Sequence, residues 1–220
     1  MIPSLRRAVT LGADLRHDAS RMATLAALAL ALALALALAA CAPAPISPSP
    51  VVPSDRGETT VYLVRHAEKA TDNPSDPELS ARGYARADSL ATQLREAGIN
   101  VILTTHFKRT ILTAAPLARL RNVTPEVVPA RGTTAAHIDS VVAAVRRNPG
   151  ATILVVGHSN TIGRIAEALG GDKVGDLCDN EYSNLIVLAM PRAKPTRMLI
   201  ESYGLPDSPG DGSCRPLRSR

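Results

Sequence analysis

The run Thr60-Val-Tyr-Leu-Val64, followed at once by Arg65-His66, is the stretch of sequence that decides the fold. Two later apolar runs have the same character, and each is also followed by basic residues: Val101-Ile-Leu-Thr104 before Lys108-Arg109, and Ala151-Thr-Ile-Leu-Val-Val156 before Gly157-His158. Short runs rich in β-branched residues, separated by helix-like stretches, are typical of buried parallel strands. In open α/β sheets the ligand crevice lies beyond the carboxyl ends of the strands. We therefore expect two histidines and two arginines to meet at one edge of one sheet: Arg65, His66, Arg109 and His158.

The remaining sequence alternates helix and strand signals. We expect helices over residues 80–97, 108–120, 134–146 and 161–169, and further strands over residues 127–128, 184–190 and 197–202. This alternation predicts an α/β fold, a three-layer α/β/α sandwich with a mostly parallel central sheet. About 150 residues are enough for one such core.

The first 40 residues have the features of an export signal. Four arginines precede a stretch from Leu25 to Ala40 that contains only Leu and Ala, and Cys41 follows it. The ending Leu38-Ala-Ala-Cys41 resembles the lipobox of bacterial lipoproteins, which implies that residues 1–40 are a signal peptide and that Cys41 is the lipidated first residue of the mature chain. Two or more acyl chains would anchor the protein stably. An uncleaved membrane anchor is the alternative, since the apolar stretch is near the lower length limit for spanning.

The mature chain is expected to have three parts. Residues 41–58 form a linker rich in proline and serine, residues 59–204 form the folded domain, and residues 205–220 form a C-terminal tail. Ala42 stands after Cys41, in place of the aspartate that retains many lipoproteins at the inner membrane. We therefore expect an exported protein at the periplasmic face of the outer membrane or at the cell surface.

Composition limits the partners. The formal net charge of +5 falls to about +3 once residues 1–40, with four arginines and two aspartates, are removed. No basic stripe with interleaved aromatic residues exists, so nucleic acid is not expected as a partner. Cys178 and Cys214 are the cysteines left besides Cys41, and the sequence is compatible with a disulfide between them or with two unrelated thiols. Their wide spacing, with no histidine beside them, predicts no zinc site.

Phosphate chemistry suits the clustered residues. Arginine gives paired, charge-assisted hydrogen bonds to phosphate oxygens, and a histidine nitrogen can accept a phosphoryl group as a covalent intermediate. The chain here resembles the histidine phosphatase superfamily, the phosphoglycerate-mutase-like group. The motifs that carry the resemblance stand in the family's order over about residues 59–190: Leu63-Val-Arg-His-Ala67-Glu68, Leu79-Ser-Ala-Arg-Gly83, Leu103-Thr-Thr-His-Phe-Lys-Arg-Thr110 with Thr113-Ala-Ala-Pro-Leu-Ala118, and Val155-Val-Gly-His-Ser-Asn-Thr161.

The resemblance implies roles for four residues. His66 would be the phosphorylated nucleophile, Arg65 and Arg109 would clamp the phosphate, and His158 would donate a hydrogen bond to it, with no metal or other cofactor. His106 and His137 are expected to face solvent.

The sequence departs from the family pattern at three places. Ala67 replaces the usual glycine, and Ser159-Asn160 follows His158 where acid phosphatases and phytases have an aspartate. The usual glutamate general acid has no clear counterpart. Glu68, Glu126 and Asp139 are candidates, although Glu68 fits a supporting or surface partner of Lys69 better.

The sequence therefore predicts a metal-independent phosphatase that acts through a phosphohistidine on His66. Its substrates would be phosphomonoesters or phosphohistidine-type compounds, on a small molecule or a phosphoprotein. A missing general acid favours a good leaving group, such as phosphohistidine or an acyl phosphate. With no obvious cap insertion, we expect an open mouth and specificity that is broad or directed at proteins. The rival functions are a phosphomutase, which needs the missing acid, and a catalytically silent surface lipoprotein that binds anions or a partner.

Overall fold

The computed structural model describes residues 57–71 and 73–217. The predicted signal peptide, Cys41 and residues 42–56 of the predicted linker lie outside this part of the chain. Within the described residues, no helix combines the length and the apolar character needed to cross a bilayer.

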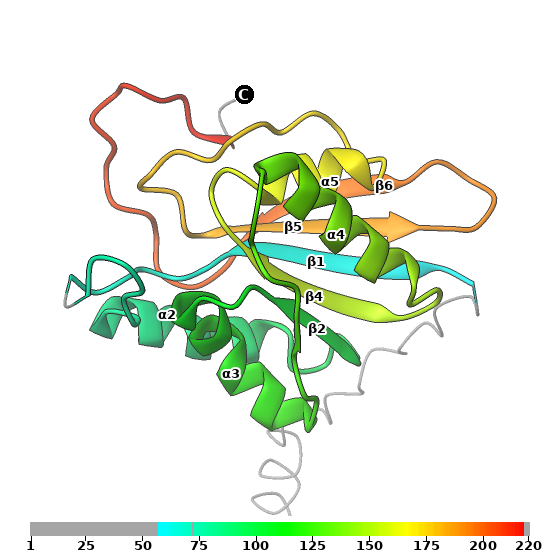
Figure 1. Ribbon diagram of the computed structural model, residues 1–220, viewed down its shortest axis with the longest axis horizontal. Coiled ribbons are helices and arrows are strands. Elements are labelled where there is room, and N and C mark those ends of the chain that lie inside the picture. Colours follow the sequence, from blue (N-terminus) through cyan, green and yellow to red (C-terminus); the bar gives the residue numbers. More distant parts are fainter. Residues whose placement is uncertain (1–56, 72, 218–220) are drawn as a thin grey trace, which may run out of the picture. The chain divides into compact units, whose positions relative to one another are not determined.

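The described chain folds into strands and helices that follow one another in near alternation (Figure 1). The strands are β1 (Thr59–Arg65), β2 (Val101–Thr104), β3 (Glu126–Val127), β4 (Thr152–Gly157), β5 (Asn184–Met190) and β6 (Arg197–Ser202). The helices are α2 (Ala81–Gln93), α3 (Lys108–Arg121), α4 (Thr134–Arg146) and α5 (Ile162–Ala168).

The six strands form one mixed sheet in the order β3-β2-β4-β1-β5-β6. The pairs β1–β4, β2–β4 and β2–β3 are parallel, whereas β5 is antiparallel to both β1 and β6. The last two strands can pair antiparallel because a short turn joins them, whereas each parallel pair is connected through a helix. The expected mostly parallel sheet is therefore confirmed, with an antiparallel edge.

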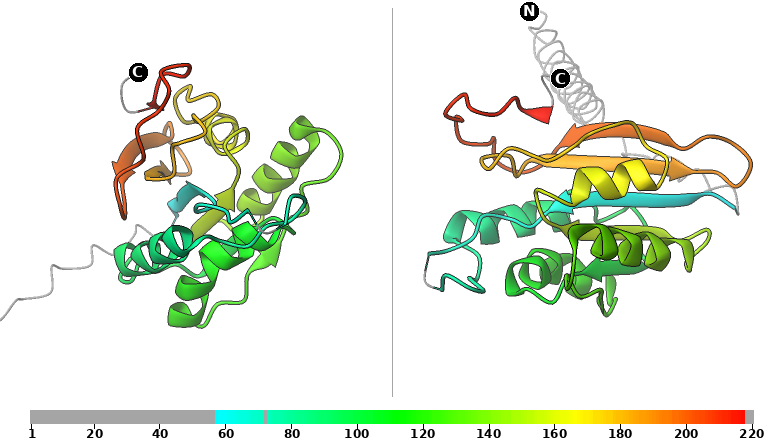
Figure 2. Two further views of the ribbon diagram at one scale, coloured as in Figure 1. Left: turned by 90° about the vertical axis from the view of Figure 1, so that its left-hand side faces the viewer. Right: turned by 45° about the horizontal axis from the view of Figure 1, so that its top comes forward.

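Helices cover both faces of the sheet, which gives the expected three layers (Figures 1 and 2). Side chains of β1 alternate between two cores, as the period of a strand requires. Val61 and Leu63 pack in the core beneath α4 and α5, and Val64 packs in the core beneath α2 and α3.

Helix α2 is shorter than the sequence predicts. It ends at Gln93, and Leu94 caps it, whereas the sequence predicts a helix through residue 97. The segment after it continues as turns, with the Ala97 N–H bonded to the Leu94 carbonyl, and Gly98 takes a positive φ of 73°. Leu94 is nevertheless buried, so the apolar pattern outlasts the helix.

Candidate active site

The register of the parallel strands sets the position of the candidate residues. Arg65 lies opposite Gly157, and Thr104 lies opposite Val156, so β1, β2 and β4 end at one edge of the sheet. The His66 N–H extends this pairing by one bond of 2.9 Å to the Gly157 carbonyl. The left panel of Figure 2 looks onto the side where these strands end.

His66 is held as a neutral imidazole. Its Nδ1 lies 2.8 Å from the Ala67 carbonyl oxygen, and because a carbonyl only accepts, Nδ1 carries the proton and Nε2 keeps a free lone pair. Burial lowers the pKa of His66 to about 3. The Ala67 carbonyl opposes this shift, and the charges of Arg65, His158 and Arg109 add to it. At neutral pH, His66 is therefore an uncharged imidazole with an unprotonated Nε2.

His158 lies beside His66, with ring centroids 5.4 Å apart in an edge-on arrangement. Its Nε2 is 3.2 Å from the Thr105 hydroxyl, which is 3.0 Å from the Thr110 hydroxyl. The Thr110 hydroxyl donates to the Phe107 carbonyl at 2.8 Å, so it accepts from Thr105, and Thr105 in turn accepts from Nε2–H of His158. Burial, followed by the charge of Arg109, lowers the pKa of His158 to about 3.

Arg65 is buried against the loop that follows α5. Its Nη1 donates to the backbone carbonyls of Cys178, Asp179 and Glu181 at 2.9–3.0 Å. Nη2 donates to the Tyr182 hydroxyl at 3.2 Å, and the guanidinium lies 4.0 Å from the centre of that ring. Nε is buried and has no hydrogen-bond partner. An orphaned buried N–H of this kind costs stability and indicates a place for a ligand oxygen.

Arg109 is the second residue of α3. Its guanidinium lies 4.2 Å above the Phe107 ring, and Nη1 is 3.9 Å from a carboxylate oxygen of Asp76. Burial lowers the pKa of Arg109, Asp76 opposes that shift, and the charge of Arg65 adds to it. The two arginines are thus close enough to repel each other, and a bound anion would relieve that repulsion.

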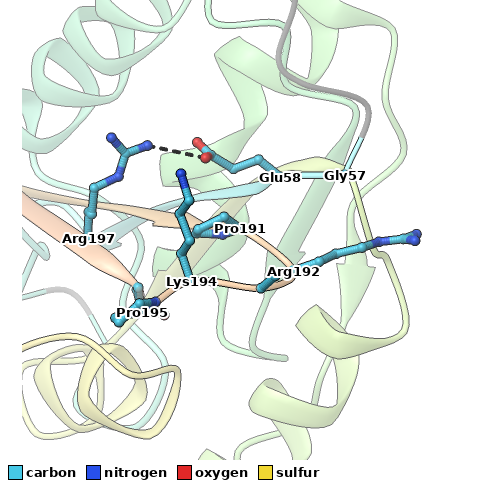
Figure 3. Close-up of a pocket in the computed structure, with 9 residues that line it drawn as sticks. Gly57, Glu58, Pro191, Arg192, Lys194, Pro195 and Arg197 are labelled. Atoms are coloured by element: carbon cyan, nitrogen blue, oxygen red, sulfur yellow. Dashed lines mark hydrogen bonds and ion pairs between the residues drawn. The ribbon is translucent and has the colours of Figure 1, made fainter.

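A pocket of about 260 Å³ opens at this edge, and Arg109 and His158 line it. The rest of its wall comes from Phe107, from Asn160 and Thr161, and from the start of α4 and the loop before it. A larger hollow of about 800 Å³ lies at the turn between β5 and β6, where Arg197 pairs with Glu58 beside Lys194 (Figure 3). Its lining contains no histidine or cysteine, and it lies where β1 begins, at the opposite end of that strand from His66. The smaller pocket thus contains two of the four predicted residues, Arg109 and His158, whereas Arg65 and His66 lie beside it and are not among the residues that line it.

None of the three predicted acid candidates reaches this pocket. Glu68 is held by Arg86, with three contacts of 2.8–3.0 Å, and by Arg82 at 2.9 Å. Burial alone would raise the pKa of Glu68, but the hydrogen bonds and charge of Arg86 outweigh it, so the pKa is lowered. The predicted pairing with Lys69 is replaced by this buried pair, because Arg86 is fully enclosed and needs a counter-charge. Glu126 pairs with Arg147, and Asp139 is exposed on α4.

The motif Leu79-Ser-Ala-Arg-Gly83 supports the loop after His66. Ser80 donates its N–H to the Glu68 carbonyl at 2.9 Å and accepts from the Gly83 N–H as the cap of α2. A Cβ at Gly83 would lie only 2.1 Å from the Glu68 carbonyl oxygen. Only glycine therefore lets α2 approach this closely.

The structure also brings to the site residues that sequence reasoning missed. Tyr182 contacts Arg65 and lies edge-on to His66, with ring centroids 6.3 Å apart. Asp76 accepts from the Lys108 N–H at 3.0 Å and thus caps α3 beside Arg109. The sequence contains a weak signal for each of these two residues: Asp76 precedes a proline, and Tyr182 lies shortly before the strand β5.

The structure corrects the predictions for two other histidines. His137 was expected to face solvent and is instead buried, at 4% exposure, in the wall of the pocket. His106, also expected to face solvent, is half-buried and accepts from the Ala130 N–H.

The C-terminal tail supports the same loop. Cys178 and Cys214 form a disulfide, with Cα atoms 5.7 Å apart. The Asp207 carboxylate accepts from the backbone N–H groups of Tyr182 and Ser183, each at 2.9 Å. The buried Glu181 carboxylate accepts from the N–H groups of Leu217 and Cys178. The loop that holds Arg65 is therefore fixed from behind by the last residues described.

Comparison with known proteins gives one family match and several similar folds. Residues 61–131 match the family model of the histidine phosphatase superfamily (branch 1). The fold is similar to that of the protein histidine phosphatase SixA in complex with tungstate (20% identity, TM-score 0.53), over 65% of this chain and 96% of that one.

Two further structures show the same likeness. One is a mycobacterial glucosyl-3-phosphoglycerate phosphatase, with 13% identity and a TM-score of 0.51 over 66% of this chain and 98% of that one. The other is YhfR of Bacillus stearothermophilus, with 17% identity and a TM-score of 0.51 over 65% of this chain and 96% of that one. No curated relative matches the sequence. At these identities the structures show the fold alone. The family model covers about a third of the chain, so residues 61–131 are similar to branch 1 of the histidine phosphatase superfamily, and the solved structures show that the domain has the fold of these proteins.

Proposed function

We propose that the domain is a metal-independent phosphatase that hydrolyses phosphomonoesters or phosphohistidine-type substrates through a phosphohistidine on His66. The observation that carries the proposal is the hydrogen bond from Nδ1 of His66 to the Ala67 carbonyl, together with the lowered pKa of this histidine. Together they leave an uncharged Nε2 lone pair beside His158. An imidazole in this state can attack phosphorus without first losing a proton.

In the first step, the Nε2 lone pair forms a bond to phosphorus, and the bond from phosphorus to the leaving group breaks with its electron pair. Arg109 and the free Nε–H of Arg65 offset the charge on the phosphoryl oxygens. A bound dianion opposes the burial that keeps His158 neutral, so we expect the pKa of His158 to rise on binding. In the second step, water attacks phosphorus, the N–P bond returns its pair to Nε2, and phosphate leaves.

The leaving group determines how far the missing acid matters. The residues that line the pocket include no carboxylate, and Asp76, the carboxylate beside Arg109, is engaged by that arginine and by the Lys108 N–H. We therefore expect an alkoxide to depart without a carboxylic acid to protonate it. Phosphohistidine, acyl phosphates and aryl phosphates avoid this difficulty because their leaving groups are stable anions or are protonated easily. The same absence disfavours a phosphomutase.

We further propose that Cys41 is lipidated and anchors the domain outside the cytoplasmic membrane. The Leu38-Ala-Ala-Cys41 ending and the proline-rich spacer support this proposal. Globomycin treatment of the producing cells and mass spectrometry of the mature N-terminus test it. A chain that retains residues 1–40 after export would reject it.

The enzymatic proposal is tested with para-nitrophenyl phosphate, with and without a chelator. The wild type, His66→Ala and Arg119→Ala are compared, because Arg119 lies ten residues beyond Arg109 on α3, about 15 Å along the helix. We expect chelator-resistant, vanadate-sensitive turnover in the wild type and in Arg119→Ala. Rapid quench into alkali should also trap an acid-labile adduct on His66. Equal turnover in His66→Ala would reject the nucleophile, and no turnover of any phosphate would favour the silent binding protein.

A further inference from the structure

The chain enters the domain at the end of the sheet opposite His66. Three segments meet there: the start of β1 at residues 57–58, the end of α4 and the turn after it at residues 146–150, and the turn from β5 to β6 at residues 191–197 (Figure 1). The Gly150 N–H donates to the Thr59 hydroxyl at 2.9 Å, and Arg197 pairs with Glu58 at 3.2 Å. We call these three segments the entry face. The strand β1 separates it from His66 by about 25 Å.

The entry face is strongly basic. It has five arginine and lysine side chains and a single carboxylate, whereas the rest of the described domain has 13 basic and 15 acidic side chains. The single carboxylate, Glu58, is engaged by Arg197, and Arg147 pairs with Glu126 of β3. Within the described chain, no carboxylate lies within ion-pair distance of the other three basic groups, which are those of Arg146, Arg192 and Lys194. Positive charge is therefore concentrated where the chain enters the domain.

The turn that carries two of these groups is exposed and braced. Arg192 and Lys194 are both exposed, and prolines at positions 191 and 195 restrict the backbone around them. The Thr196 hydroxyl donates to the Leu169 carbonyl at 2.9 Å and ties the turn to the end of α5. Between this turn and the start of β1 lies the hollow of about 800 Å³ (Figure 3), which is large enough for a phosphate-bearing headgroup.

The length of the linker keeps this face near a membrane. Fifteen residues, 42–56, separate Cys41 from Gly57, and an extended chain of this length reaches at most about 55 Å. A tether this short holds the domain at a high effective concentration beside the bilayer, so weak contacts with the surface are sufficient. Each basic group close to an anionic lipid surface contributes about fivefold in affinity.

We propose that the entry face docks on anionic phospholipid headgroups of the membrane that holds the chain's anchor, so that His66 faces the solution. The inference rests on the proposed anchoring at Cys41 and adds an orientation to it. A site turned away in this way lies about 25 Å or more from the phosphates of the same bilayer. The docked domain therefore takes its substrates from solution or from other proteins.

Lysine labelling of the full chain tests the orientation. The chain is extracted from the membranes of the producing cells with whichever anchor it carries, and is reconstituted in vesicles of phosphatidylcholine, with or without one third phosphatidylglycerol. A membrane-impermeant acetylating reagent then labels Lys194 on the entry face and the exposed Lys69 in the loop after His66, and mass spectrometry gives each rate. We expect Lys194 to react at least fivefold more slowly in the anionic vesicles, and Lys69 to react equally in both.

Two double variants separate the entry face from the net charge. Arg146→Ala with Arg192→Ala removes two basic groups of the face and keeps Lys194 as the reporter, so most of its protection should be lost. Arg131→Ala with Arg164→Ala removes the same charge elsewhere, because Arg131 lines the pocket at the strand ends and Arg164 is in the first turn of α5. This control should keep the protection. Half-molar salt should abolish it in every variant, because salt screens exposed charges.

Three outcomes would overturn the proposal. Equal labelling of Lys194 in the two kinds of vesicle would reject the docking, and equal protection of Lys69 would reject the orientation. Protection of Lys194 by soluble glycerol phosphate in phosphatidylcholine vesicles, to the same degree, would assign the hollow to free phosphates and reject the membrane surface. The labelling requires no turnover, so it decides the docking even if the domain is catalytically silent. Mass spectrometry of the same sample shows separately whether Cys41 is lipidated.

Discussion

The disulfide between Cys178 and Cys214 provides a prediction whose size follows from the structure. The bridge closes a loop of 36 residues. In the chain-entropy description, a loop of this length restricts the unfolded state by about 4 kcal/mol at 25 °C. For a domain of this size, that corresponds to a change in Tm of roughly 8–16 °C.

The variant to use is Cys214→Ser in a Cys41→Ser background. Cys214 is exposed, so its replacement leaves no buried hydroxyl, whereas Cys178 is buried. The background change removes the only other thiol that could pair with Cys178. Urea unfolding should show a loss of about 4 kcal/mol in the free energy of unfolding. Phosphatase activity should also fall, because Cys178 and the residues after it supply the carbonyls that hold Arg65.

Reduction of the parent protein supplies the matched control. A phosphine reductant should lower the stability of the Cys41→Ser protein by the same amount and should leave Cys214→Ser unchanged. A loss below about 1 kcal/mol in both experiments would refute the loop-entropy argument. Free-thiol titration of the untreated protein checks that the bridge was present at the start.

Three further predictions concern charge and the leaving group. Glu68→Gln should destabilise the domain by about 1–3 kcal/mol in urea unfolding, because the fully buried Arg86 loses its closest carboxylate and keeps only Asp207, at 3.6 Å. Replacing Glu68 and Arg86 with Leu and Met should recover part of the loss, and an unchanged midpoint would contradict the role of the pair. His66 and His158 have pKa values of about 3 in the fold against 6.5 when unfolded, so the unfolded chain binds more protons between these values. The stability they contribute is complete above pH 6.5 and falls as the pH is lowered toward 3, by up to about 2.7 kcal/mol per pH unit. In the variant with both His66→Gln and His158→Gln, the free energy of unfolding should depend less steeply on pH in this range. Equal slopes for the variant and the wild type would contradict the pKa values. In a series of aryl phosphates, kcat/KM should fall steeply as the pKa of the leaving phenol rises, and a flat series would reveal a general acid.

Much of the fold could be predicted because local patterns and long-range packing agree. The structure gives three elements the bounds that the spacing of their apolar residues predicts: β5, β6 and α4. The prediction succeeds because each of them buries one face against a neighbour. α2 shows where the two diverge, because Leu94 is buried after the helix has ended. A periodic pattern records which side chains face the core and not which hydrogen bonds the backbone makes.

The placement of the four predicted site residues follows from topology, since Arg65 ends β1 and the other three follow strands that end at the same edge of the sheet. What the sequence could not provide was the partners of these residues. Nothing near Arg65 in the sequence indicates that residues 178–182 would surround its guanidinium, because that contact spans more than a hundred residues. Burial of His137 was missed for a similar reason, since one polar residue on an amphipathic helix does not show which neighbour covers it.

The support of the Arg65 loop by Asp207 and Leu217 has a consequence for biosynthesis. A ribosome delivers these residues more than a hundred positions after β1 and its arginine. We therefore expect the parallel strands to pair before residues 205–217 dock behind the carbonyls around Arg65. A chain that stops at residue 204 should keep the sheet while its Arg65 loop lacks this support.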